Sequence, residues 1–362
     1  MYRHEENFNR KKVLFVLRGM AEQVKGITGT YPGEFFFGYF QIKEKMGDAC
    51  DYVVITDERL RSHLVRFLRI FEKIFSKITR LGFPLDVSLD FRQAVGKSQV
   101  VFAADEALGF VVLLYKLLGI IKGEVVIMVM SLPERVKYFK KNWLVIWIIR
   151  KLFAQADVVL TLSDYAQSDL GKYFLIPKTK MKTMYFGIDI DFWHPEPVPT
   201  ESFILSIGND MNRDYETLID ALPENMSLVL VTKKRIDTKG KNVKYLSGIS
   251  HEELRTLYNR AVMVVVPSIM LKNESSGLSC TLQGMATRRP VIVSYSPPLA
   301  EMFTDGHDCL FYHPGDAQDL REKINRLLTQ EDFRNKIADQ GNVAVTTKYS
   351  LAAVKKVWNS IL

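Results

Sequence analysis

Short apolar runs recur along the chain and alternate with longer stretches in which apolar residues return every three or four positions. Apolar runs rich in Val and Ile are typical of buried strands, and the longer periodic stretches are typical of helices. One such helix is expected from Glu34 to Lys45. Strands that alternate with helices form βαβ units, so we expect an α/β protein with parallel sheets. The expected strands are KVLFVL (12–17), DYVVITD (51–57), SQVVFAA (98–104), GEVVIMVM (123–130), ADVVLTLS (156–163), FILSIG (203–208), SLVLVT (227–232), NVKYLS (242–247), MVVVPS (263–268) and PVIVSYS (290–296).

A proline-rich segment divides this pattern into two similar halves. Three prolines lie within five residues, at Pro195, Pro197 and Pro199, and make a helix or central strand unfavourable there. We therefore expect an N-terminal domain over 1–193 and a second domain over 194–345. Residues 346–362 are expected to form a C-terminal helix that crosses back to the first domain.

The composition narrows the class of protein. Apolar residues make up 47% and charged residues 25% of the 362 residues, which is typical of soluble globular proteins. The three cysteines show no metal-type spacing and predict a reducing compartment without disulfides. The N-terminus lacks a signal-peptide pattern, and the longest apolar runs are too short to span a bilayer. A cytoplasmic protein, soluble or peripheral on a membrane, is expected.

The net charge of +8 lies entirely in the first half. Residues 1–193 hold 29 basic and 21 acidic side chains, whereas the remainder holds 20 of each. An anionic macromolecule or membrane is therefore expected to meet the first half. Nucleic acid is the weakest of these partners, because the excess is modest and no nucleic-acid-binding module is recognisable.

Polar residues follow several of the expected strands. Ligands of parallel sheets bind beyond the carboxyl ends of the strands, which makes these residues candidates for a binding site. In the second half they include cations and glycines and suit a phosphorylated ligand. These second-half candidates are Gly208, Asn209, Arg213 and Lys233, and the first-half candidates are Gly19, Asp105, Glu106 and Ser131.

The stretch NESSGLSCTLQGMA, from Asn273 to Ala286, reads as a loop followed by a helix that begins near Gly277. The first amide hydrogens of a helix are unpaired, and its dipole adds about half a positive charge at that end. A diphosphate would fit there, and Arg213 would add a bidentate contact. The alternative is that Ser275 and Ser276 serve only as a helix cap, and the two interpretations are about equally favoured.

From about Ala156 onward, the chain resembles family 4 of the retaining glycosyltransferases, which have the GT-B fold of two Rossmann-like domains facing across a cleft. The stretches that carry the resemblance are ADVVLTLSDYAQSDL, FGIDIDFWHP, FILSIGNDMNRDYETLIDAL, GISHEELRTLYNRAVMVVVPS, GLSCTLQGMATRRPVIVS and DGHDCLFYHPGDAQDL. They cover over half of the chain in the family's order. The first half matches only in its βα pattern and its glycine loop.

The resemblance implies sugar transfer from a nucleotide-sugar donor with retention at the anomeric carbon, without a metal or other cofactor. A UDP-sugar is favoured over a GDP-sugar. The donor would lie mostly on the second domain. Arg213 matches the family's basic diphosphate contact, and Ser276, Gly277 and Leu278 match the loop whose amides face the donor; Ser279 and Lys233 are further donor-side candidates.

Two acidic positions of the family are altered. The second of its two glutamates falls at Gln283, which can still hydrogen-bond a ribose hydroxyl, and the first falls at Ser275, with Glu274 one place away. A strand-end position that is often arginine is Asn209 here, and Lys233 is expected to compensate unless it belongs to a solvated basic patch. We name Glu274 as a catalytic candidate.

On the first domain, the family's histidine position is lost at Ser131. Asp105, the second catalytic candidate, is expected to hold acceptor hydroxyls together with Glu106, although capping of a helix by Asp105 is at least equally favoured. Gly19, Gly29 and Ser131 complete the acceptor-side candidates.

Two basic stretches with aromatic stripes, residues 62–81 and 135–153, suit a membrane interface. Packing of the same stripes against the sheet is the alternative. The favoured function is thus a glycosyltransferase, peripheral on the inner face of the membrane, that acts on a lipid-linked or glycan acceptor in surface polysaccharide or glycolipid synthesis. The alternatives are a GT-B nucleotide-sugar epimerase and a non-catalytic protein that binds a nucleotide sugar or a partner.

Overall fold

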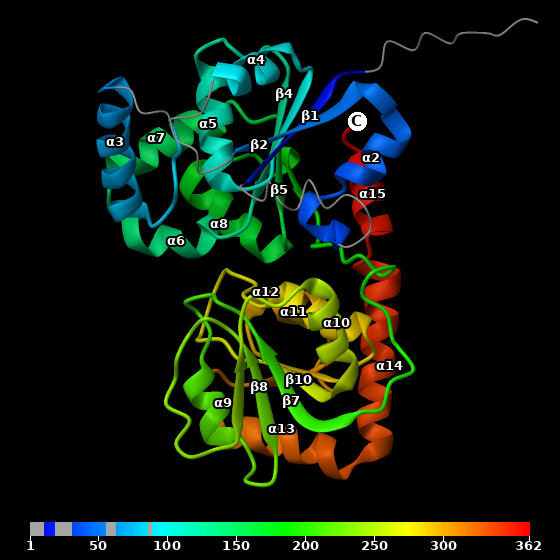
Figure 1. Cartoon of the computed structure of the whole chain (residues 1–362). Helices are drawn as coiled ribbons and strands as arrows, with labels where there is room; N and C mark the ends of the chain where they lie inside the picture. The colour runs from blue at the N-terminus through cyan, green and yellow to red at the C-terminus, as the bar shows by residue number, and fades with distance from the viewer. Residues whose placement is uncertain (1–10, 19–30, 56–62, 86–88) are drawn as a thin grey trace, which may run out of the picture.

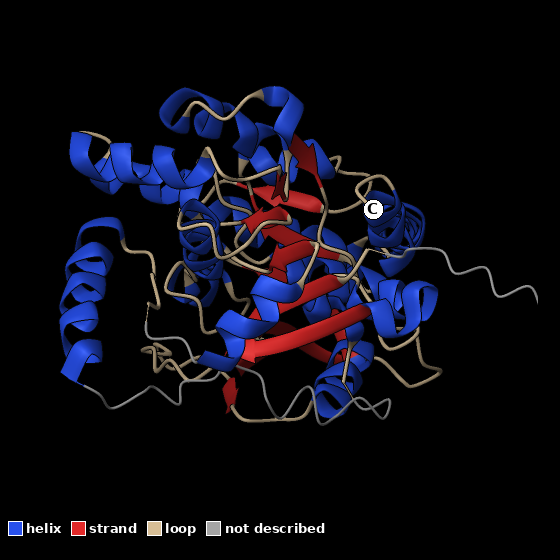
Figure 2. Cartoon of the chain, turned by 90° about the horizontal axis from the view of Figure 1, so that it is seen from above, coloured by secondary structure: helices blue, strands red, loops and turns tan. Residues whose placement is uncertain are grey.

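The chain forms two parallel sheets that lie one above the other (Figure 1). The computed structural model describes residues 11–18, 31–55, 63–85 and 89–362. The strand order is β2-β1-β3-β4-β5-β6 in the first sheet and β12-β11-β10-β7-β8-β9 in the second. Helices cover both faces of the strands, as the view from above shows (Figure 2). The expected α/β class with two Rossmann-like sheets is confirmed.

The first domain contains residues up to the end of β6. Its elements are β1 (Val13–Arg18), η1 (Gly33–Phe36), α2 (Tyr39–Met46), η2 (Gly47–Ala49), β2 (Cys50–Ile55), α3 (His63–Thr79), α4 (Leu89–Lys97), β3 (Val100–Ala103), α5 (Glu106–Leu117), β4 (Glu124–Val129), α6 (Leu132–Phe139), α7 (Trp143–Phe153), β5 (Val158–Thr161), α8 (Asp164–Phe174), η3 (Lys178–Lys180) and β6 (Met181–Thr183).

The second domain begins with β7, and its last helices return to the first domain. Its elements are β7 (Glu201–Ile207), α9 (Tyr215–Ala221), β8 (Ser227–Val231), β9 (Val243–Leu246), α10 (His251–Arg260), β10 (Ala261–Val266), α11 (Leu278–Ala286), β11 (Val291–Ser294), α12 (Pro297–Met302), β12 (Leu310–Tyr312), α13 (Ala317–Thr329), α14 (Glu331–Lys348) and α15 (Leu351–Asn359).

All ten expected strands are present. The pattern missed two edge strands, β6 and β12, because each has only three residues and neither forms a long apolar run. The central strands β3, β4 and β10 are buried almost throughout, which explains why their sequences read as continuous apolar runs rather than as alternating ones.

The expected helix from Glu34 to Lys45 is wrong near its start, where it is interrupted at residues 37–38. The chain forms η1, then turns through Phe37 and Gly38, both with positive φ (51° and 85°), and only then enters α2. A Cβ atom at Gly38 would lie 2.8 Å from Val354 and 2.9 Å from Trp358, so the close approach of α15 requires a glycine there.

The last helix packs on the first domain. Trp358 of α15 is fully buried, and its ring centroid lies 5.0 Å from that of Phe15 on β1 and 4.9 Å from that of Phe102 on β3. Its indole N–H donates to the carbonyl oxygen of Phe37 (2.7 Å). In Figure 1, α14 and α15 run along one side of the molecule from the lower sheet to the upper one.

The segment before the prolines packs with the second domain. Ile188, Phe192 and Trp193 are buried in the apolar cluster that covers one face of the second sheet. The domain limits at 193/194 and 345/346 stay a proposal, since this segment shares its core with the residues that follow it.

Carboxylates from both domains accept hydrogen bonds across the interface. Glu301 of α12 accepts the backbone amides of Asp164 and Tyr165 at the start of α8 (both 2.8 Å). Glu134 of α6 and Glu34 of η1 make similar contacts from the first domain to the second, described below. Because these carboxylates accept hydrogen bonds across the interface, the carboxyl ends of the two sheets face each other across it.

Candidate active site

The candidate donor residues meet beyond the carboxyl ends of two neighbouring strands. β7 ends at Ile207 and β10 at Val266, and the two strands pair side by side in parallel. Gly208 follows β7 directly, with a φ of 142°, and the side chain of Arg213 returns to the same place. A Cβ atom at Gly208 would lie 2.4 Å from the Arg213 Nε, so the glycine leaves the space that the guanidinium occupies.

Arg213 is buried, with 8% of its surface exposed, and its guanidinium contacts four protein atoms. Its Nε donates to the carbonyl oxygen of Ile207 (3.0 Å), and its Nη1 reaches the hydroxyls of Ser268 and Ser276 (both 3.2 Å). Its Nη2 lies 3.6 Å from the Cys280 sulfur. The guanidinium therefore has one fixed orientation against the loop that precedes α11.

The start of α11 lies against the same guanidinium. Gly277 is the N-cap residue of α11 and has a φ of 85°. A Cβ atom there would lie 2.3 Å from Val266 Cγ1 and 2.9 Å from Arg213 Nη1. Leu278 is buried and Ser279 half-buried in the first turn, whose amides have no partner within the helix. The positive end of the helix and a guanidinium thus converge, which suits an anion such as a diphosphate.

Asp210 is a functional candidate that the sequence analysis missed. Its carboxylate accepts the Ser276 hydroxyl (2.6 Å) and the backbone amide of Asn212 (2.9 Å). Burial opposes its ionisation, but these hydrogen bonds and the nearby charges of Arg213 and Lys234 lower the pKa of Asp210 overall. Its position among the residues after β7 was the available signal.

Asn209 and Lys233 are tied to each other rather than to the guanidinium. The Asn209 side-chain oxygen accepts the backbone amide of Lys233 (2.6 Å) and the hydroxyl of Thr232 (3.3 Å). Asn209 thereby joins the ends of β7 and β8, while the Lys233 side chain is exposed. Their predicted contacts with a donor stay predictions.

Gln283 lies in a chain of hydrogen bonds that connects the two domains. Its Oε1 accepts from the Tyr258 hydroxyl (3.0 Å), and its Nε2 donates to Glu34 Oε1 (3.2 Å). Glu34 also accepts the indole N–H of Trp193 (2.7 Å). The predicted contact of Gln283 with a ribose stays a prediction, and it would compete with Tyr258 and Glu34 for the same amide.

Glu274 lies in the loop before α11 beside charges from both domains. Burial raises the pKa of Glu274 to about 7, with Arg135 opposing the shift and the carboxylates of Asp210, Glu134 and Glu106 adding to it. Its Oε2 is buried and has no hydrogen-bond partner. Ser275, beside it, is half-buried.

The acceptor-side candidates are engaged within the first domain. Asp105 caps α5, accepting the amide of Leu108 (2.8 Å), and lies 3.7 Å from the Arg18 guanidinium. Burial raises the pKa of Asp105 although Arg18 opposes this. The capping alternative is therefore the one observed, and a catalytic role of Asp105 stays a prediction.

Glu106 and Ser131 are bonded to each other at the turn between β4 and α6. Glu106 accepts the backbone amides of Ser131 (3.0 Å) and Met130 (3.1 Å) and also the Ser131 hydroxyl. These hydrogen bonds stabilise the turn. The predicted contact of Glu106 and Ser131 with an acceptor stays a prediction. Gly19 and Gly29 lie outside the described residues.

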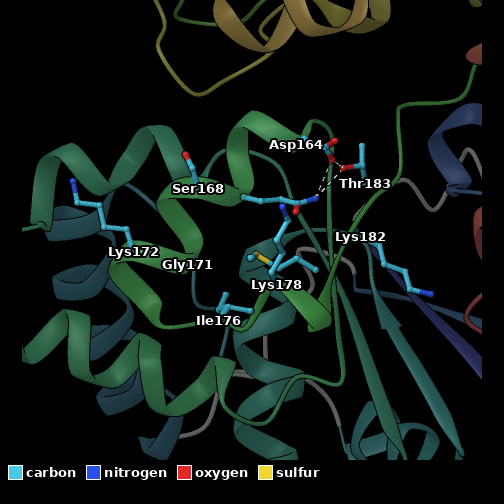
Figure 3. Close-up of a pocket in the computed structure, with 10 residues that line it drawn as sticks. Asp164, Ser168, Gly171, Lys172, Ile176, Lys178, Lys182 and Thr183 are labelled. Carbon is cyan, nitrogen blue, oxygen red and sulfur yellow. Dashed lines mark hydrogen bonds between the residues drawn. The ribbon is translucent and has the colours of Figure 1, made fainter.

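One hollow of about 620 Å³ lies between α8 and β6, away from Arg213. Asp164 accepts from Thr183 and Gln167 on its wall, and the side chains of Lys172 and Lys182 point in opposite directions (Figure 3). Lysines that diverge in this way do not form a joint anion site.

Two features are absent from the described part of the chain. No group of three or more His, Cys, Asp or Glu side chains is arranged to hold a metal ion. No helix among those residues has the length and apolarity needed to cross a bilayer.

Nearly the whole chain superposes on two solved structures. HepE of Anabaena, crystallised with UDP and glucose, superposes with a TM-score of 0.70 at 14% identity, over 97% of this chain and 99% of its own. A sucrose-phosphate synthase from Thermosynechococcus elongatus gives 0.70 at 17% identity, over 97% and 98%. At such low identities these similarities establish the fold alone, which is GT-B.

Sequence similarity to curated relatives covers about half of the chain. The chain is 24% identical to an uncharacterized glycosyltransferase of Methanocaldococcus jannaschii over 57% of this chain, and 25% identical to the O-antigen chain mannosyltransferase RfbU of Salmonella typhimurium over 50%. It spans 60% and 54% of the length of these two relatives. Residues 197–343 match the family described as Glycosyl transferases group 1. The match to the glycosyl transferases group 1 family thus covers residues 197–343, in the second half of the chain, and the two sheets give the whole chain the GT-B fold.

Proposed function

We propose that the protein is a retaining glycosyltransferase that transfers a sugar from a nucleotide-sugar donor to a lipid-linked or glycan acceptor. The observation that carries this proposal is the convergence of the Arg213 guanidinium and the N-terminus of α11 at one place beyond β7 and β10. The diphosphate of a donor is an anion that fits this place. Synthesis of surface polysaccharide or glycolipid is the proposed pathway class.

The same residues account for the chemistry. As the bond to the sugar breaks, negative charge develops on the departing diphosphate, and fixed donors that face this charge lower the barrier. Arg213 is oriented by four protein atoms before any ligand arrives, so no reorganisation is needed at that step. Because a guanidinium and a helix dipole supply this positive charge, we propose that transfer is independent of a metal ion.

UDP is favoured as the nucleotide. The Anabaena neighbour was crystallised with UDP and glucose, and the Salmonella relative is described as an O-antigen chain mannosyltransferase. These descriptions support a nucleotide sugar and a surface polysaccharide, and they leave the sugar of this chain to experiment.

The test begins with thermal shifts in the presence of UDP-glucose, UDP-galactose, UDP-N-acetylglucosamine and GDP-mannose. A donor at one hundred times its dissociation constant stabilises the folded state by about 2.7 kcal/mol. Arg213→Met is expected to abolish the shift. Arg255→Met is the matched control, because Arg255 also bonds a carbonyl oxygen and pairs with a carboxylate in the same domain. No shift with any nucleotide sugar would refute the proposal.

A second function, binding without turnover, is favoured by the arrangement at Gln283. This residue stands where the family often has a glutamate, and its amide is already bonded to Tyr258 and Glu34. Product analysis with a radiolabelled donor separates the two functions. Binding of the donor without sugar transfer to any added lipid or glycan, with EDTA and with Mg²⁺, would favour the second.

We further propose that the first domain lies peripherally on the inner, anionic face of a membrane. On α7, Trp143 is 76% exposed and Trp147 51%, on the face opposite the buried Ile149. The exposed Lys140, Lys141 and Lys151 lie at the two ends of this helix. Exposed tryptophans flanked by lysines suit the interface of an anionic bilayer.

Tryptophan fluorescence tests this association directly. The chain has four tryptophans, and the other two, Trp193 and Trp358, are fully buried. Vesicles of phosphatidylcholine mixed with phosphatidylglycerol are therefore expected to shift the emission of Trp143 and Trp147 to shorter wavelength, and vesicles of phosphatidylcholine alone are not. Unchanged emission and no flotation with the anionic vesicles would refute membrane association.

A further inference from the structure

Among the buried polar atoms without a hydrogen-bond partner, two come from opposite domains and belong to side chains that interact electrostatically near the proposed donor site. One is Nε of Arg135 on α6 in the first domain, and the other is Oε2 of Glu274 in the loop before α11. Buried polar groups in folded proteins are almost always satisfied, so such a pair calls for an explanation. A ligand that binds between the two domains would explain why both atoms lack a partner in the protein.

Neighbouring residues hold together the two segments that carry these side chains. Glu134, next to Arg135, is 4% exposed and accepts the backbone amides of Lys272 (3.1 Å) and Asn273 (2.9 Å), which directly precede Glu274. The Asn273 side chain donates in turn to Asp169 of α8 (2.9 Å). The first domain thus holds the loop by its backbone and by a side chain, and α6 carries both Glu134 and the Arg135 Nε that has no partner.

The electrostatic surroundings are mixed in sign. Facing Glu274 are the cation of Arg135 and the carboxylate of Glu134 from α6, Glu106 from α5 and Asp210 from the loop after β7. Burial raises the pKa of Glu274 to about 7, and the Arg135 charge is the largest influence in the opposite direction. Above pH 7 the site therefore holds one cationic donor and one anionic acceptor that interact electrostatically.

The chemistry of the two atoms selects the ligand. A phosphate would pair with Arg135 but would be repelled by Glu274, and a metal cation would do the opposite. Adjacent hydroxyl groups satisfy both, because each hydroxyl can accept from a guanidinium or donate to a carboxylate. Glu274 lies three residues before Gly277, so such hydroxyls would belong to the part of the donor beyond the diphosphate.

We propose that Arg135 binds the sugar of the donor, opposite Glu274, so that the sugar is gripped by one side chain from each domain. This role rests on the proposed function and adds to it a residue of the first domain. The two side chains can bind the sugar together only when the domains are closed, because Glu134 must then reach the loop at 272–273. Arg135 would thus discriminate between a nucleotide sugar and the nucleotide that remains after transfer.

Calorimetry with two pairs of ligands, UDP against UDP-glucose and GDP against GDP-mannose, tests this role at pH 8. Arg135→Met is expected to weaken binding of the nucleotide sugar about tenfold and to leave binding of the nucleotide unchanged, since one charge-assisted hydrogen bond is lost. Arg135→Lys should restore part of the affinity. Lys122→Met removes an exposed cation of the first domain, in the loop before β4, and is the matched control.

A pH series adds a readout that a merely structural residue would not change. Without the Arg135 cation, ionisation of Glu274 becomes harder, so the acidic limb of sugar-dependent binding should move to higher pH in Arg135→Met. Equal weakening of nucleotide and nucleotide sugar, or no weakening of either, would overturn the role of Arg135. A wild-type protein that binds none of the four ligands would instead overturn the proposed function itself.

Discussion

Replacement of Glu34 by glutamine should change how the stability of the protein depends on pH. Glu34 is 1% exposed, and its carboxylate accepts from Trp193 (2.7 Å) and Gln283 (3.2 Å). Burial raises the pKa of Glu34 from 4.5 to about 7, and the nearby Asp189 adds to this, while the hydrogen bonds from Trp193 and Gln283 oppose it. The folded protein therefore holds this proton more tightly than the unfolded chain does.

The size of the effect follows from the shift. One pKa unit corresponds to about 1.4 kcal/mol, so a rise from 4.5 to about 7 corresponds to about 3 kcal/mol. Because the folded pKa lies above the unfolded one, the stabilisation from the proton is complete below about pH 4.5. This stabilisation is lost as the pH rises through 7 and is absent at higher pH.

Urea unfolding of the wild type and of Glu34→Gln between pH 5 and pH 8 measures this contribution. The free energy of unfolding of Glu34→Gln minus that of the wild type should rise by about 3 kcal/mol over the series, because glutamine has no proton to lose. Glu224→Gln, at an exposed position of the second domain, should keep the pH dependence of the wild type. A difference curve for Glu34→Gln that stays flat within about 0.5 kcal/mol would refute the reasoning.

Two further predictions concern packing. Gly277→Ala should cost about 2 kcal/mol or more of stability and abolish donor binding, because its Cβ would lie 2.3 Å from Val266 Cγ1 at a φ of 85°. Gly306→Ala has a φ of 70° but its Cβ atom would lie in open space, so it should lower the free energy of unfolding by only about 1 to 2 kcal/mol. Scanning calorimetry of both variants measures the two losses, and equal losses would contradict the steric argument. Trp358→Ala should cost about 3 to 5 kcal/mol in urea unfolding, because it empties a fully buried site between α15 and the first sheet. Trp143→Ala, at a 76% exposed position, should change the free energy of unfolding by less than about 0.5 kcal/mol.

The parallel sheets were predictable because their signal is local. Runs such as VVIMV in β4 and VMVVV in β10 are apolar on both faces, as a strand covered by helices on both sides must be. The break between η1 and α2 was not predictable, since it depends on Trp358 and Val354, more than 300 residues away in the chain. The stretch 135–153 likewise divides into α6 and α7 at Asn142, which caps α7 by accepting the amide of Val145 (3.2 Å).

The donor-side cluster was partly predictable for the same reason. Gly208, Arg213 and Gly277 each follow a strand or begin a helix, and neighbouring parallel strands place such positions at one edge of the sheet. Glu34, Glu134 and Arg135 carry no such signal, because their roles depend on which residues of the other domain they meet.

The structure explains why a glutamine rather than a glutamate occupies position 283. Its Nε2 lies 3.2 Å from Glu34 Oε1, in a site where Glu34 is 1% exposed. A glutamate at 283 would place a second carboxylate against the first, and both could not be ionised there at once. The amide instead donates to Glu34 and accepts from Tyr258. The carboxyl group at this point therefore comes from Glu34 of the first domain, and Gln283 connects it to α11 of the second.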